Sequence, residues 1–294
     1  MIKYNFSPGP AKLNNSVLEI VHKNIIEYQE EGVSILEISH RSDSFEKILE
    51  TTKKNLIELL KIPSNYQILF LQGGATFQNT FLGNNINQKK STSNLITGTW
   101  GQKTYEDFIK IRDSKKILLE NNQILEFLNQ PLPDDIQNTD YMHITSNETI
   151  EGIQINNFNK IENDLIIDSS SDIGSYIFDW DNVAYLYAGA QKNLGIPGVT
   201  ISVVRDDFIE RNDNPTYLNL YKLINKDYAR YAIEDTLLNQ GFKWSKTASK
   251  EKVAKLTFKV PVTISGKLDI DKQNEIALKL KKVDLIKNKI SIEL

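Results

Sequence analysis

Cysteine is absent from this sequence of 294 residues, and histidine occurs only three times. Without cysteine the chain can form no disulfide, no thiol nucleophile and no thiolate metal site. The histidines, His22, His40 and His143, are scattered along the chain. A metal site built from several imidazoles is therefore not expected, and the predicted site contains no metal.

Long apolar runs and an excess of basic charge are also missing. No apolar run reaches the length of a membrane span, and the first residues, MIKYNFSPGPAKL, lack the pattern of a secretion signal. The formal net charge is −3, and acidic and apolar residues separate the lysines of the C-terminal third. These features predict a cytoplasmic protein that binds neither membranes nor nucleic acid.

Apolar stretches typical of strands alternate with helical patterns up to about residue 205. Strands are expected at 67–72, 94–97, 116–120, 141–146, 164–168, 183–188 and 199–204, and helices at 15–30, 45–60, 77–86 and 102–111. Several of these strands are apolar on both faces, which is typical of strands buried in a parallel sheet. The pattern predicts an α/β fold with a mostly parallel sheet and helices on both of its faces.

Three local predictions concern the first helices. Gly32 is expected to end the first helix, and Ser44 to cap the second. The stretch SILEIS (34–39) between them is expected to be extended. It would deliver the pair His40 and Arg41.

The pattern changes past residue 205. Segments 206–212 and 216–240 are expected to be helical or irregular, followed by a strand at 256–264, a helix at 271–283 and a strand at 289–294. This succession predicts a small α+β domain at the C-terminus. We expect a large domain over residues 13–240, and a small one formed by residues 1–12 and 241–294.

The stretch Tyr185–Arg205 places one lysine in a turn between two buried strands. Gln191 and Lys192 follow the apolar strand 183–188, and a glycine-rich turn then leads into strand 199–204. Apolar surroundings favour the free amine of a lysine, which carbonyl chemistry requires. A solvated lysine in a surface turn is the alternative interpretation.

Other strands of the predicted sheet also end in polar or glycine-rich segments. Gly73–Thr76 lies between a strand and a helix, where backbone N–H groups can bind an anion, although a plain tight turn explains it as well. Trp100 could offer a stacking face or lie in a core or interface. Asp168 could be a metal ligand, a general base, the partner of a ring nitrogen or a cap. Ligands of open parallel sheets collect at this edge.

Together these groups match the needs of one cofactor, pyridoxal phosphate. The lysine would bond to the aldehyde, and the aspartate would keep the pyridine nitrogen protonated. The glycine-rich turn would hold the phosphate, and the indole would face the ring. We therefore expect pyridoxal phosphate as the cofactor.

The chain also resembles the phosphoserine aminotransferase family of fold-type-I pyridoxal-phosphate enzymes. The matching motifs are NFSPGP (5–10), SHR (39–41), QGGAT (72–76), GTWG (98–101), SNETIEGI (146–153), DSSS (168–171), YAGAQKNLGIPG (187–198) and NPTYLNLYK (214–222). They follow the family's order over about the first 225 residues. The resemblance implies a fold-type-I large domain with a small C-terminal domain.

The resemblance also implies roles for individual residues. Lys192 would form the Schiff base and move the substrate proton, Asp168 would pair with the pyridine nitrogen, and Trp100 would stack on the ring. The other cofactor-binding residues would be Gly74, Ala75, Thr76, Thr149, Ser170 and Gln191, with Thr149 on the phenolic oxygen and Ala75, Thr76 and Gln191 on the phosphate. His40 and Arg41 would bind anionic groups of the substrate.

The implied reaction is a ping-pong transamination in serine biosynthesis. Glutamate would give its amino group to the cofactor, which would then aminate 3-phosphohydroxypyruvate to O-phosphoserine. The substrates would be glutamate and a phosphorylated three-carbon oxo acid. By resemblance we also expect a homodimer.

Three departures from the family pattern fall near the C-terminus. Ala232 and Ile233 stand in the segment 228–236 where the family has an Asn-Thr-Pro-Pro-Thr motif, and the last strand has Lys289 in place of an arginine. A lysine cannot form the bidentate fork of a guanidinium. The chain is also shorter than the family's usual length. The alternative interpretation is a paralogue that binds the cofactor but has another substrate or a non-catalytic role.

Overall fold

The structure is a computed structural model that describes residues 8–29, 31–119, 123–124 and 137–209, with residues 272, 273, 275, 276 and 279. The chain divides into two units, Met1–Asn214 and Pro215–Leu294. In the second unit the described residues are helical, as predicted for 271–283. The predictions at 216–240, 256–264 and 289–294, and most of 206–212, lie outside the described residues. The proposed domain bounds therefore stay a prediction.

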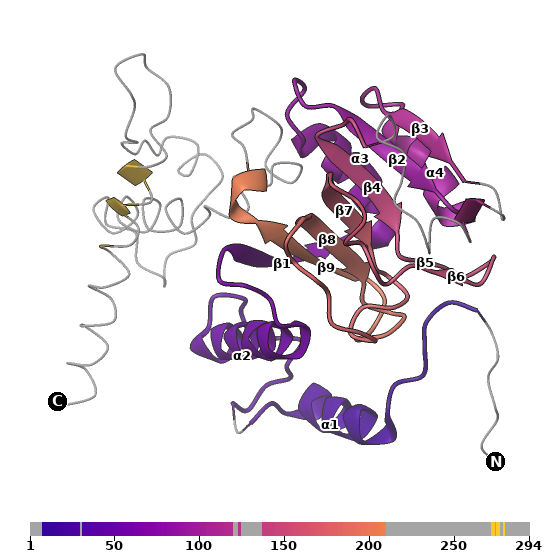
Figure 1. The fold of residues 1–294 in the computed structure, drawn as a ribbon. Helices are drawn as coiled ribbons and strands as arrows, with labels where there is room; N and C mark the ends of the chain where they lie inside the picture. The colour runs from indigo at the N-terminus through magenta and orange to yellow at the C-terminus, as the bar shows by residue number, and fades with distance from the viewer. Residues whose placement is uncertain are drawn as a thin grey trace. The chain divides into compact units, whose positions relative to one another are not determined.

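The first unit is built on a mostly parallel sheet, shown in Figure 1. Its strands are β1 (Tyr66–Gln72), β2 (Thr92–Ile96), β3 (Lys115–Leu118), β4 (Tyr141–Thr145), β7 (Asp164–Asp168), β8 (Val183–Gly189) and β9 (Val199–Arg205). The order across the sheet is β1-β9-β8-β7-β4-β2-β3. Strands β3, β2, β4, β7 and β8 pair in parallel, whereas β9 runs antiparallel to both β8 and β1. The predicted α/β fold is confirmed.

Because β9 alone is reversed, β1 runs in the same direction as the parallel strands. The segments that follow β1, β2, β4, β7 and β8 consequently leave the sheet at one edge. A short hairpin of β5 (Asn147–Glu148) and β6 (Ile153–Gln154) lies directly after β4 at this edge. Motifs far apart in sequence are thereby brought together.

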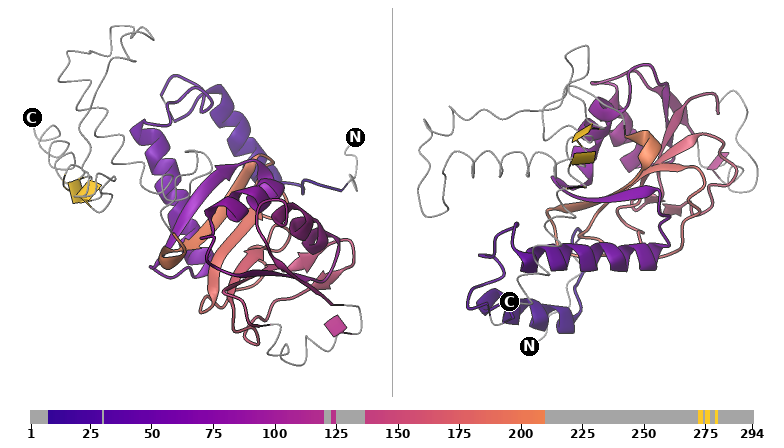
Figure 2. Two further views of the ribbon diagram at one scale, coloured as in Figure 1. Left: turned by 90° about the horizontal axis from the view of Figure 1, so that it is seen from above. Right: turned by 90° about the vertical axis from the view of Figure 1, so that its left-hand side faces the viewer.

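Helices cover both faces of the sheet (Figure 2). Helices α3 (Gly74–Asn85) and α4 (Thr99–Phe108) pack on one face, and α2 (Asp43–Leu60) lies on the other. The α2 face is apolar, since Leu60 of α2, Ile167 of β7 and Leu186 of β8 share one buried core with their neighbours. The α3 face is partly polar: the hydroxyl of Tyr185 donates to Gln78 of α3 at 3.0 Å.

Helices α1 (Asn15–Ile26) and α2 begin at side-chain caps. The cap of α1 is Asn14, whose side chain accepts from the N–H of Ser16 at 3.0 Å. The cap of α2 is Ser42, which accepts from Phe45, so the prediction of Ser44 as the cap is wrong. The reason is local: the hydroxyl of Ser44 is turned to the carboxylate of Glu31 instead.

The segment before α2 also differs from its prediction. Residues 34–39 form turns rather than an extended stretch, because the hydroxyl of Ser34 accepts from Leu36 and the N–H of Ser34 donates to Glu37. Such local bonds compete with extended structure. Helix α1 ends at Ile26, well before Gly32, and Gln29 takes a positive φ of 44° just after it.

Helices α3 and α4 each begin about three residues earlier than expected, at Gly74 and Thr99. This shift matters for function, because it places Gly74–Thr76 and Trp100 in the first turns of the two helices. Both helices begin after a glycine without a side-chain cap. The usual sequence signal for a helix start is therefore absent.

Candidate functional site

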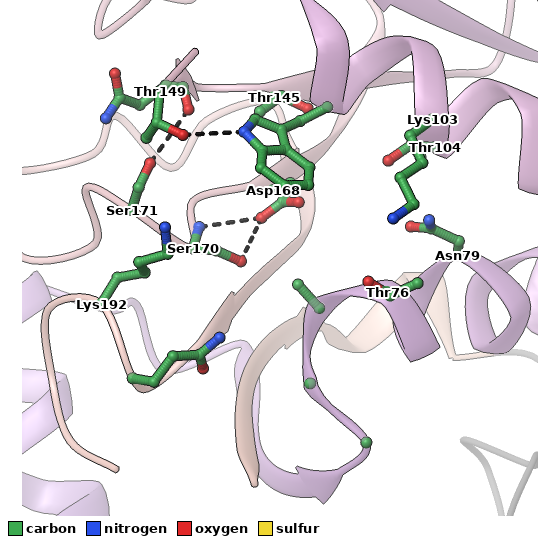
Figure 3. Close-up of a pocket in the computed structure, with 16 residues that line it drawn as sticks. Thr76, Asn79, Lys103, Thr104, Thr145, Thr149, Asp168, Ser170, Ser171 and Lys192 are labelled. Atoms are coloured by element: carbon green, nitrogen blue, oxygen red, sulfur yellow. Dashed lines mark hydrogen bonds between the residues drawn. The ribbon is translucent and has the colours of Figure 1, made fainter. Parts of the chain in front are cut away.

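A pocket of about 260 Å³ lies at the edge where these strands end (Figure 3). It is lined by segments that follow β1, β2, β4, β7 and β8, and by side chains of α3 and α4. Each cofactor-binding residue predicted from the sequence is among the lining residues: Gly74, Ala75, Thr76, Trp100, Thr149, Asp168, Ser170, Gln191 and Lys192. Residues spread over more than a hundred positions thus share one cavity.

The glycine turn Gly73–Thr76 forms one wall at the N-terminus of α3. Gly73 and Gly74 have φ values of 99° and 66°, a region that glycine enters without strain. A Cβ on Gly73 would lie 2.8 Å from Phe77, so the close approach of the backbone requires glycine there. No side chain caps α3. Its first N–H groups and its dipole therefore favour an anion, such as a phosphate, at this end of the pocket.

Trp100 forms a second wall and is held by two groups. Its indole N–H donates to the hydroxyl of Thr149 at 2.9 Å, and its backbone N–H donates to the carboxylate of Glu148 at 2.9 Å. The side chain is 38 % exposed. A large aromatic face is thus fixed on the cavity, with the ammonium of Lys103 5.9 Å from the centroid of the ring.

Asp168 ends β7 and reaches the pocket with a supported carboxylate. Its Oδ1 accepts from the hydroxyl of Ser170 at 2.6 Å and from the N–H of Ser170 at 3.0 Å. The hydroxyl of Ser170 in turn accepts from the N–H of Gly189 at 3.0 Å, which ties the loop after β7 to the end of β8. Burial raises the pKa of Asp168, and the bonds from Ser170 oppose that rise.

Lys192 lies opposite the glycine turn, in the segment after β8. Figure 3 shows its amine extended into the cavity toward Ser170. The N–H of Ala11 donates to the carbonyl of Gln191 at 2.8 Å, so the N-terminal arm lies against this turn. The lysine is partly buried. The structure therefore places this lysine in a turn on the wall of the pocket.

Two buried polar atoms on the pocket wall have no partner among the described residues. They are the hydroxyl of Thr145 and the amide oxygen of Gln191. Buried polar groups in proteins are nearly always hydrogen-bonded, so a ligand or water is expected to meet them. An anion site, an aromatic face, a carboxylate and a primary amine surround the same space. This donor set fits a planar heterocycle that carries a phosphate and an aldehyde, as pyridoxal phosphate does.

His40 and Arg41 do not line this pocket. They are exposed in the turns that precede α2. Their predicted role in binding substrate anions stays a prediction.

Other side chains of the site were not predicted from the sequence. Lys103 and Thr104 of α4 and Asn79 of α3 also line the pocket. All three lie within the helices expected at 77–86 and 102–111, so their place at the cavity depends on how α3 and α4 are rotated about their axes. Glu148 lies in the motif SNETIEGI (146–153), but nothing in the sequence around it indicates that it contacts Trp100 and Gly101.

Two features are absent from the part of the chain that the structure describes. No group of three or more histidine, aspartate or glutamate side chains within them is arranged to hold a metal ion. No helix within the same residues is long and apolar enough to cross a membrane.

Comparisons with known proteins agree with this geometry. The family model described as aminotransferase class-V matches residues 3–228. The phosphoserine aminotransferase of Lactococcus lactis subsp. cremoris is 36 % identical over 258 residues, which cover 83 % of this chain and 70 % of that protein. The corresponding protein of Streptococcus suis is 36 % identical over 281 residues, covering 93 % and 74 %.

Solved structures give the same result. A phosphoserine aminotransferase from Bacillus circulans subsp. alkalophilus superposes with a TM-score of 0.66 at 32 % identity, covering 81 % of this chain and 77 % of that one. A pyridoxal-phosphate-bound phosphoserine aminotransferase from Trichomonas vaginalis gives a TM-score of 0.67 at 28 % identity, covering 76 % and 68 %.

The chain therefore belongs to the class-V aminotransferases and, among them, to the phosphoserine aminotransferase family. The predicted family is confirmed. The match covers 64 % of another solved phosphoserine aminotransferase, which has a TM-score of 0.69. The departures noted at Ala232, Ile233 and Lys289 lie outside the described residues.

Proposed function

We propose that the chain binds pyridoxal phosphate at Lys192 and transfers an amino group from glutamate to 3-phosphohydroxypyruvate, giving O-phosphoserine. One observation carries the proposal: the glycine turn, Trp100, Asp168 and Lys192 surround a single cavity. The phosphoserine aminotransferases at 36 % identity support the choice of substrates. The bound cofactor would act as an electron sink that stabilises negative charge at the substrate Cα.

The residues of the chain would then have distinct tasks. The open N-terminus of α3 would hold the phosphate, and the indole of Trp100 would cover one face of the ring. The carboxylate of Asp168 would hold a proton on the ring nitrogen. Burial makes an unpaired carboxylate costly, so Asp168 favours a cationic partner at this position.

Lys192 would carry the proton during the reaction. Its amine reaches the side of the cavity next to Ser170. With substrate in the cavity, the amine of Lys192 would take the proton from the substrate Cα and pass it to the cofactor carbon that carries the nitrogen, which is the proton movement that transamination requires. Its placement in a concave site, with the glycine turn opposite, keeps it within the same space as the ring.

The reaction can be tested in two steps. Purified protein with pyridoxal phosphate should show the absorbance of the lysine-bound cofactor, and glutamate should bleach it while 2-oxoglutarate appears in equal amount. Adding 3-phosphohydroxypyruvate should restore the band and release O-phosphoserine. Lys192→Ala should abolish both steps. A protein that never takes up cofactor contradicts the proposal, and a band that returns only with another oxo acid contradicts the substrate.

We also propose that the chain acts as a homodimer in the cytoplasm. Helix α1 supports the dimer, because none of its residues is buried. Its apolar side chains are largely exposed: Val17, Leu18, Ile20, Val21, Ile25 and Ile26. A contiguous apolar surface of this kind is typical of an interface. Sedimentation analysis should give twice the mass of 33.6 kDa, and Ile20→Glu should shift the protein toward the monomer.

A further inference from the structure

Helix α4 has no capping side chain at the residue that precedes it. The residue before it, Gly98, has no side chain and makes no cap bond. The first N–H groups of a helix have no partner within the helix, so they need one from elsewhere. Two carboxylates from the segment after β4 supply it. The carboxylate of Glu151 accepts from Thr99 at 2.9 Å, and that of Glu148 accepts from Trp100 at 2.9 Å and from Gly101 at 2.8 Å.

The two carboxylates differ in their surroundings. Glu148 is fully buried, with an exposed fraction of 0 %, whereas Glu151 is exposed. Burial raises the pKa of Glu148, and the two backbone N–H groups oppose that rise. No lysine or arginine among the described residues forms an ion pair with Glu148. The N–H groups and dipole of α4 therefore stabilise its charge.

The glycines on either side of Trp100 leave room for this carboxylate. A Cβ on Gly98 would lie 2.7 Å from the Cδ atom of Glu148, and one on Gly101 would lie 3.0 Å from its Oε1. Thr149, the residue after Glu148, accepts the indole N–H of Trp100. The same short segment thus holds both the backbone and the ring of the tryptophan.

We propose that Glu148 is a positioning residue that fixes the first turn of α4 and so sets the orientation of Trp100 on the cofactor pocket. The proposal rests on the proposed function for its consequence, which is the placement of the indole over the cofactor ring. Glu148 itself does not line the pocket. It acts through Trp100.

Glu148→Gln tests this role, and Glu151→Gln is its matched control. Both variants exchange a carboxylate at the N-terminus of α4 for an amide, but only Glu148 accepts from the N–H of Trp100. The amide offers one acceptor oxygen to two donors and turns an NH₂ group toward them. Titration of cofactor-free protein with pyridoxal phosphate should give a Kd raised about tenfold in Glu148→Gln, since bonds to charged groups are the stronger ones. The Kd of Glu151→Gln should stay within about twofold of the wild type.

A second readout needs no cofactor. In each protein the fluorescence of Trp100 is taken as the difference between the spectra recorded with and without Trp100→Phe. In Glu148→Gln this difference should shift in wavelength, and its quenching by iodide should change. It should not change in Glu151→Gln. If the wild type binds no pyridoxal phosphate, the proposed function fails, and the role of Glu148 is decided by this fluorescence.

Equal effects in the two glutamine variants would show general helix capping and overturn the proposal. An unchanged Kd and fluorescence in a folded Glu148→Gln would overturn it too. If Glu148→Gln does not fold, Glu148→Asp replaces it, because the shorter carboxylate keeps the charge but cannot reach both N–H groups. A severalfold rise in Kd with altered Trp100 fluorescence supports the proposal, and wild-type values contradict it.

Discussion

Replacing His143 should flatten the pH dependence of stability. His143 lies on β4 with 1 % of its surface exposed, and its Nε2 is 3.0 Å from the hydroxyl of Tyr187. Burial lowers its pKa from 6.5 to about 3. In the unfolded chain the same imidazole takes up a proton near pH 6.5, where the folded chain does not.

The direction in which stability changes with pH follows from this difference in pKa between the folded and the unfolded chain. Above pH 6.5 both states are neutral at His143, and its contribution to stability is fully present. As the pH falls toward 3, the unfolded state binds a proton that the folded state refuses, and stability is lost by about 1.4 kcal/mol per pH unit. At pH 4.5, two units below the ordinary pKa, the loss amounts to about 2.7 kcal/mol.

The assay is urea denaturation of the cofactor-free protein between pH 7.5 and 4.5. The fall in the free energy of unfolding should be about 2.7 kcal/mol larger in the wild type than in His143→Gln, whose amide can still bond to Tyr187 without titrating. Other groups titrate equally in both proteins and cancel. Exposed His22→Gln is the control and should keep the slope of the wild type. Parallel curves for the wild type and His143→Gln would refute the reasoning.

Three further substitutions test other parts of the account. Gly98→Ala would place a methyl group 2.5 Å from a carboxylate oxygen of Glu151 and should lower the free energy of unfolding in urea by about 1–3 kcal/mol. Gly195→Ala is the control and should cost little, because the nearest neighbour of its Cβ would be 3.7 Å away. Trp180→Phe removes a buried N–H bond of 3.0 Å to a backbone carbonyl of α2 and should cost about 1–3 kcal/mol; a variant as stable as the wild type would contradict that bond. Ser42→Ala should lower the thermal stability by about 1 kcal/mol and Ser44→Ala by less, and the reverse order would contradict the observed cap.

The strands could be predicted from the sequence because each is a short apolar run bounded by polar residues. Segment 164–168 was predicted at its observed bounds, and strand 183–188 was one residue too short. A strand that is buried on both faces of a sheet has a nearly continuous run of apolar residues. The mostly parallel direction of the strands could then be predicted from the helical patterns that alternate with them.

Helix starts were less predictable where the cap comes from elsewhere in the chain. The first turn of α4 is held by Glu148 and Glu151, some fifty residues away, so no local residue announces it. The glycine turn before α3 has no capping side chain at all. Because no side chain caps α3, its start could not be predicted from the sequence. For the same reason its first N–H groups are open to an anion.

Most of the pocket could be predicted because its residues follow strands that end at one edge of the sheet. Asp168 and Lys192 needed only the strand assignments to be brought together. Lys103 and Asn79 could not be found in this way, since they depend on the exact rotation of α3 and α4 about their axes. His40 and Arg41 were expected at the site but lie outside this pocket.

The claim that Lys192 holds the cofactor is tested most directly by covalent capture. Protein incubated with pyridoxal phosphate is reduced with borohydride, digested and examined by mass spectrometry. We expect a phosphopyridoxyl group on the peptide that contains Lys192, in near-stoichiometric amount, and none in Lys192→Ala. Labelling of Lys103, the other lysine that lines the pocket, or no labelling at all would contradict it.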